Sequence, residues 1–282
     1  MKATVNDSGS ISRLSRSRFL TPAPGRRFLA LSASLVLGLL TCLGQPKSGL
    51  RPTPNLNPAE AEQRGRALVA DLLEQRPQEN STNTGVMTIT DSEGSHREVP
   101  VQFEVISRPA DWLNTYDAKT AAGVPIEKLS ILHAGAQPNV YSLSRNPPSG
   151  TAKSEPLKLS PEQTMVPFAG SDFWIADLGL EFLHWPKQLL FKQEMRRGRS
   201  CNVLTSVNPH PTPGAYSRVV SWLDVESGGI VMAQAWDVRD KLLKEFAPKE
   251  MKKIQGQWQL EEMEIRNVQT DSRTVVQFNL GR

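Results

Sequence analysis

The chain has 282 residues, with 33 lysines and arginines against 29 acidic residues and a formal net charge of +4. The excess lies in residues 1–44, which hold six basic residues and one acid, whereas residues 45–282 hold 27 basic and 28 acidic residues. Composition therefore excludes an extended basic face of the kind that binds nucleic acid, and the length allows one large or two small domains.

Residues 1–44 have the pattern of an export signal. An arginine-rich start ends at Arg26-Arg27, and 17 residues without a charge follow it, up to Gly44. This length, with proline-rich sequence after it, favours a cleaved signal peptide over a membrane anchor. We expect cleavage near Gly44 and a periplasmic mature protein. General and twin-arginine export both remain open, and lipidation of Cys42 would instead give a membrane-anchored lipoprotein.

The mature part begins with a proline-rich linker, residues 45–57, and one domain is expected over residues 58–282. Asn57 is followed by a proline and, three residues after the asparagine, by Glu60. This capping-box spacing predicts the start of a helix that runs to about Gln75.

Alternating apolar and polar residues follow in many short runs, which is the pattern of antiparallel strands with one buried face. Examples are 99–105, 216–225, 230–237 and 274–280, and the glycine-rich turn at 226–229 predicts a hairpin. We expect about ten or eleven strands in an antiparallel sheet that curls into an open or closed barrel around helices.

An aromatic stretch, residues 168–186, interrupts the strands. It holds three of the nine phenylalanines and two of the six tryptophans. Trp174, Leu178, Phe182 and Trp185 have helical spacing, so one apolar stripe on a single helix is expected. The stretch is either a helix packed on the core or a cover over an apolar cavity, and both interpretations remain open here.

Signatures of catalysis and of metal binding are missing from the sequence. The four histidines show no metal-ligand spacing, and no phosphate-binding loop, dinucleotide fingerprint or nucleophile elbow occurs. We therefore expect a protein that is not an enzyme, with no catalytic residue, no metal and no cofactor. The alternative is a cavity hydrolase that uses His184, near Asp172 and Asp177, or another histidine.

The motif Gly170-Ser171-Asp172-Phe173, followed by Asp177-Leu178, resembles the G-[ST]-D-F…D-L signature of the LolA-like outer-membrane lipoprotein-sorting proteins. The resemblance extends over residues 58–280. It implies an α+β fold, a curved antiparallel half-barrel of about eleven strands with helices covering its concave apolar face. The cavity between them holds the acyl chains of lipoproteins. It also implies an inner-membrane transporter and an outer-membrane acceptor as partners, and a cover that opens and is therefore held by modest contacts.

On this basis we expect a monomeric carrier of an acylated lipoprotein or another lipid, with no nucleic-acid partner. An envelope-anchored interaction module is the main alternative. The residues expected to line or cover the cavity are Phe173, Trp174, Leu178, Phe182, Trp185, Trp222, Met232 and Trp236. Gly170, Ser171, Asp172 and Asp177 are expected to be structural, with Asp172 and Asp177 as acids that start and cap a helix.

Overall fold

A computed structural model describes residues 57–146, 155–254 and 257–280 of the chain. The expected signal peptide, its cleavage site near Gly44, Cys42 and nearly all of the linker lie outside the described residues. Within the described ranges, no helix is long and apolar enough to cross a membrane.

The described residues form one antiparallel sheet of 13 strands, in the order β6-β5-β4-β3-β2-β1-β13-β12-β11-β10-β9-β8-β7. The strands are β1 (Ser81–Thr90), β2 (His96–Ser107), β3 (Trp112–Lys119), β4 (Pro125–His133), β5 (Val140–Arg145), β6 (Leu157–Leu159), β7 (Lys187–Arg196), β8 (Arg199–Val207), β9 (Arg218–Asp224), β10 (Ile230–Trp236), β11 (Leu242–Ile254), β12 (Gln257–Asn267) and β13 (Ser272–Phe278). The expected antiparallel sheet is confirmed, but the expected count of 11 is too low. The shortest strand, β6, has only three residues and forms one edge of the sheet.

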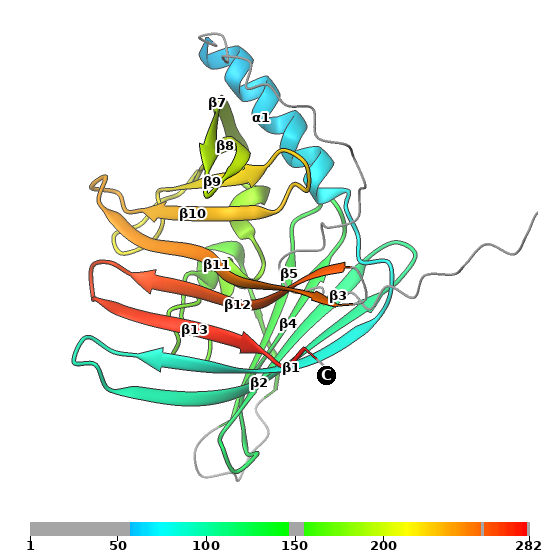
Figure 1. The fold of residues 1–282 in the computed structure, drawn as a ribbon, viewed down its shortest axis with the longest axis vertical. Coiled ribbons are helices and arrows are strands. Elements are labelled where there is room, and N and C mark those ends of the chain that lie inside the picture. Colours follow the sequence, from blue (N-terminus) through cyan, green and yellow to red (C-terminus); the bar gives the residue numbers. More distant parts are fainter. Residues whose placement is uncertain (1–56, 147–154, 255–256, 281–282) are drawn as a thin grey trace, which may run out of the picture.

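The sheet is strongly curved, so that β3, β4 and β5 face β10, β11 and β12 across the packed core (Figure 1). Side chains alternate between its two faces, and those on the concave face form the core. In β2, for example, Val99, Val101, Phe103 and Val105 are all buried. The first and last strands pair, with Gly85 opposite Phe278, and this pairing joins the two halves of the sheet.

Helix α1 (Pro58–Leu73) lies at the β7 end of the sheet (Figure 1). Its start is as expected: the Asn57 side chain accepts from the Glu60 backbone, and the Glu60 side chain accepts from the Asn57 backbone. Gly65 allows the helix to approach β7 closely, because a Cβ at this position would lie 2.3 Å from the carbonyl oxygen of Gln188.

The aromatic stretch is not the single helix that its periodicity predicts. It contains two short pieces, α2 (Ile175–Leu178) and the 3₁₀ turn η2 (Glu181–His184), preceded by η1 (Pro161–Thr164). Leu180 interrupts it with a left-handed φ of 49°. Gly179 is in contact with Tyr141, since a Cβ on Gly179 would lie 2.1 Å from the Tyr141 hydroxyl. Tertiary contacts therefore override the helical period, and the helices are fewer and shorter than expected.

Candidate functional site

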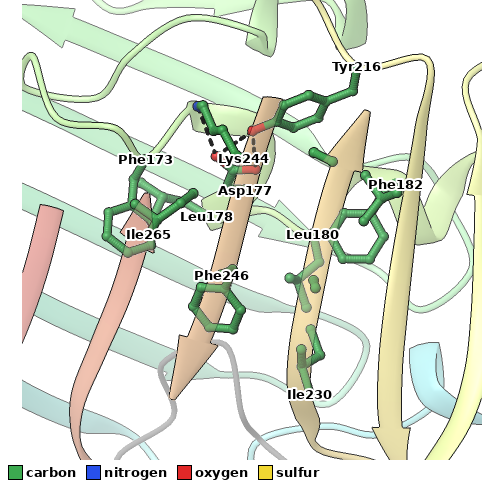
Figure 2. A pocket seen from close by; sticks show the side chains of 13 residues that line it. Phe173, Asp177, Leu178, Leu180, Phe182, Tyr216, Ile230, Lys244, Phe246 and Ile265 are labelled. Carbon is green, nitrogen blue, oxygen red and sulfur yellow. Dashed lines mark hydrogen bonds and ion pairs between the residues drawn. The ribbon is translucent and has the colours of Figure 1, made fainter. Parts of the chain in front are cut away.

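An apolar pocket lies on the concave side, between the aromatic stretch and strands β9 to β12 (Figure 2). Its volume is about 40 Å³, which is room for only a few water molecules. The lining residues are Phe173, Asp177, Leu178, Leu180, Phe182, Tyr216, Val219, Ile230, Ala233, Ala235, Lys244, Phe246 and Ile265.

Two alanines of β10 explain why there is space at this place. Ala233 and Ala235 are two residues apart, so both point to the concave face, and both line the pocket. Their methyl groups fill less volume than the branched and aromatic side chains of the neighbouring strands. A gap therefore remains between Phe182 of the aromatic stretch and the sheet.

The polar groups of the pocket gather around Lys244 (Figure 2). The Lys244 side chain is only 2% exposed, and its ammonium group donates to the backbone oxygen of Asp172 at 2.6 Å. The ammonium nitrogen lies 3.7 Å from a carboxylate oxygen of Asp177 and 3.6 Å from the centre of the Trp174 ring. Burial lowers the pKa of Lys244 to about 8, against the opposing effect of Asp177 and Asp172.

Asp177 forms the other half of this ion pair. Its carboxylate accepts from the backbone N–H of Trp174 at 2.8 Å, which caps α2. It also accepts from the hydroxyl of Tyr216, at 2.9 and 3.1 Å. Burial raises the pKa of Asp177, and Lys244 opposes that rise. Burial and the neighbouring Asp177 raise the pKa of Tyr216, so its hydroxyl remains a donor.

The turn before α2 is fixed by charged side chains of β2 and β4. The guanidinium group of Arg97 donates to the backbone oxygens of Ala169 and Gly170, both at 3.0 Å. The buried carboxylate of Glu127 accepts from the N–H of Ala169. Gly170 has a φ of +67°, and a Cβ there would meet Arg97 at 2.5 Å, so this position requires glycine.

Asp172, the next residue but one, is held by β13. Its carboxylate accepts from the hydroxyl groups of Ser272 at 2.6 Å and Thr274 at 2.8 Å. Its backbone N–H donates to the same Thr274 hydroxyl at 2.9 Å. We expected Asp172 to cap a helix, but its side chain binds the sheet.

Backbone carbonyl groups in the second half of the stretch are also bound by buried side chains. The Tyr116 hydroxyl donates to Leu178, Asn139 donates to Gly179, and Gln188 donates to Phe182 and Trp185. The stretch is therefore anchored to β2, β3, β4, β7, β11 and β13, and through Tyr216 to the segment before β9. These contacts are more extensive than the modest ones that the family resemblance implied for a cover.

Of the eight residues expected to line or cover a cavity, Phe173, Leu178 and Phe182 lie at the pocket. Trp174 and Trp185 belong to the same part of the core but do not line the pocket. Trp174 stacks on Tyr216 with ring centroids 4.6 Å apart, and Trp185 is buried.

The three residues expected from the sheet lie elsewhere. Trp222 and Met232 belong to a small cluster with Cys201 on the opposite, convex face, and Trp236 packs beneath the guanidinium group of Arg218. A register shift between Ile230 and Met232 explains the difference. It leaves Ile230 on the concave face but turns Met232 and Trp236 away from it, so these three residues do not share one face.

Sequence reasoning missed Lys244, Tyr216, Phe246 and the two alanines of β10. One local signal was present. Lys244 is two residues from Phe246, so on a strand both side chains point to the same, concave face. A lysine at such a position requires a buried acceptor. The identity of that acceptor depends on contacts that are distant in sequence.

Asp172 and Asp177, the two acids named in the hydrolase alternative, are bound by the groups described above. Burial lowers the pKa of His133, and the neighbouring His184 lowers it further. The His133 ring stacks on Trp112 with ring centroids 4.9 Å apart, and its Nε2 lies 3.2 Å from the Asn114 amide. Among the described residues, no group of three or more metal-ligating side chains occurs.

A family model described as "Uncharacterized protein" matches residues 151–280. Among solved structures, a DUF1329 family protein from Desulfovibrio piger is similar, with a TM-score of 0.61 at 20% identity over 77% of this chain and 91% of that one. A protein from Vibrio parahaemolyticus, described as an outer membrane lipoprotein-sorting protein domain, has a TM-score of 0.62 at 17% identity over 78% and 94%. No curated protein sequence matches this chain.

A LolA superfamily protein from Nitrosomonas europaea is also similar, with a TM-score of 0.50 at 16% identity over 77% of this chain and 91% of that one. At these identities the likeness concerns the fold. The resemblance drawn from the motif at 170–178 is therefore confirmed as a resemblance of fold.

Proposed function

We propose that this chain, which has a LolA-like fold, is an exported protein that binds acyl chains of a lipid or lipoprotein in its concave pocket and catalyses no reaction. The observation that carries the proposal is the apolar pocket between the aromatic stretch and β9 to β12. Two of the similar structures are described as a lipoprotein-sorting domain and a LolA superfamily protein, which supports the choice of ligand class.

The pocket must widen to accept such a ligand. Its volume of about 40 Å³ is far below the roughly 300–1,000 Å³ of ordinary ligand sites. Each CH₂ group of an acyl chain that leaves water contributes about 0.8 kcal/mol. Ten such groups therefore offer on the order of 8 kcal/mol to offset the rearrangement of the lining.

The widening is expected at the apolar end, away from Lys244. Phe246 and Leu180 line that end and are only partly buried. Phe246 packs edge-on against Phe173 at 6.5 Å, a contact that a change of rotamer would release. The anchored turn at Ala169 and Gly170 would then remain in place while the chain enters.

Export and transfer complete the proposal. The hydrophobic leader at residues 1–44 would deliver the mature domain to the periplasm. There an inner-membrane transporter would supply the acylated cargo and an outer-membrane acceptor would receive it, as the family resemblance implies.

The test is acyl-chain uptake by the mature chain, from residue 45, with a pocket-filling variant. Ala235→Phe places a ring in the pocket and should weaken binding of a fluorescent acyl probe by at least about tenfold. Gln234→Phe adds the same ring to the same strand on the opposite face and should bind as the wild type does. Circular dichroism checks that both variants fold. Binding by Ala235→Phe equal to that of the wild type, or no uptake by the wild type, would refute the proposal.

A further inference from the structure

We propose that Asp177 and Asp172 make the pocket select acyl chains with a neutral ester or amide head and reject ionised fatty acids. The inference rests on the proposed function, because it concerns the ligand of the same pocket.

The pocket is asymmetric, which defines where a head group would lie. Its polar side chains, Asp177, Tyr216 and Lys244, meet at one place, whereas Phe246 and Ile230 lie toward the other end (Figure 2). A ligand with one polar end and a hydrocarbon tail matches this arrangement. The head would lie beside Lys244, and the tail would point to Ile230.

The charges at the polar end already sum to a negative value. The two carboxylates of Asp177 and Asp172 lie near one ammonium group, that of Lys244, and both raise its pKa against the effect of burial. Lys244 is 3.7 Å from the carboxylate of Asp177, and it binds the backbone oxygen of Asp172. The carboxylate of Asp172 is stabilised by neutral hydroxyl groups of β13.

A fatty-acid carboxylate would be the third anion around this single ammonium group. Like charges repel strongly where water is excluded, so the added anion would raise the energy of the complex. An ester or amide carbonyl can accept a hydrogen bond from Lys244 and adds no charge. Tyr216 offers no alternative donor, because its hydroxyl already donates to Asp177.

The experiment compares two probes of equal length, cis-parinaric acid and its methyl ester, by fluorescence titration of the mature chain at pH 7.5. The wild type should bind the ester about tenfold more tightly than the acid. Asp177→Asn removes one anion and keeps the shape of the side chain, so the ratio should fall to about one or invert. Asp172→Asn, a second variant, should lower the ratio in the same direction.

Glu194→Gln is the matched control, since it makes the same change of charge on β7, where Glu194 binds Trp222 of the convex face. Its ratio should equal that of the wild type. A wild type that binds both probes equally, or prefers the acid, overturns the inference and leaves the proposed function intact. So does a ratio that neither aspartate variant changes. If neither probe binds the wild type, the proposed function fails together with the inference.

Discussion

His133 is a buried base whose proton uptake is coupled to folding. It is 8% exposed, and burial lowers its pKa from 6.5 to about 4. The unfolded chain therefore binds a proton at His133 between pH 6.5 and 4, whereas the folded chain does not. The contribution of neutral His133 to the free energy of unfolding is therefore fully present above pH 6.5, and it is lost as the pH falls toward 4.

We predict that His133→Gln reduces the acid sensitivity of the protein. The loss of unfolding free energy between pH 6.5 and 4 should be smaller than in the wild type by about 3 kcal/mol. Urea unfolding at a series of pH values measures this difference. His96→Gln, at an exposed position of β2, should retain the wild-type slope. Equal slopes for His133→Gln and the wild type would contradict the account of His133.

Individual site residues differed in how far they could be predicted. Phe173, Leu178 and Phe182 belong to an aromatic cluster within one short stretch, so composition alone indicates that they are buried. Lys244 and Tyr216 belong to the site because they bind Asp177, from which they are 67 and 39 residues away in the chain. No local pattern encodes such a pairing.

Among the elements, the aromatic stretch behaves as part of the sheet rather than as a hinged cover. Asp172 and Thr274 exchange two hydrogen bonds, and Thr274 is fully buried. We predict that the amide proton of Asp172 exchanges with solvent as slowly as those of the central strands, which hydrogen exchange by NMR measures.

Thr274→Val keeps the shape of the side chain and removes both hydrogen bonds. The buried carboxylate of Asp172 then loses a donor, which should cost about 1–3 kcal/mol and accelerate exchange at Asp172. Thr88→Val is the control, because Thr88 lies on the neighbouring strand β1 and its side chain points to the other face of the sheet from that of Thr274. It should change the free energy of unfolding by less than about 0.5 kcal/mol. Fast exchange at Asp172 in the wild type would show that the stretch opens as a unit.

Strand β10 shows where prediction of an element failed. Its alternation correctly indicated a strand, and the turn before it was clear. The register shift between Ile230 and Met232 reverses which side chains face inward. A shift of this kind exchanges the two faces, so Met232 and Trp236 were assigned to the pocket in place of Ala233 and Ala235.

At the scale of the whole molecule, the alternating pattern and the family motif were sufficient to predict a curved antiparallel sheet. They could not predict that β6, only three residues long, extends one edge. They also could not predict the size of the pocket, because that depends on how the aromatic stretch packs against β10. The central claim is that acyl chains enter this pocket, with the tail near Ile230 and Phe246.

Photo-crosslinking tests that claim most directly. The mature chain would be incubated with a methyl ester of a fatty acid that carries a diazirine near its methyl end, irradiated, digested and mapped by mass spectrometry. We predict adducts on Ile230, Phe246 and their neighbours on the concave face. Adducts mainly on Trp222 or Met232 of the convex face, or none at saturating ligand, would contradict the account.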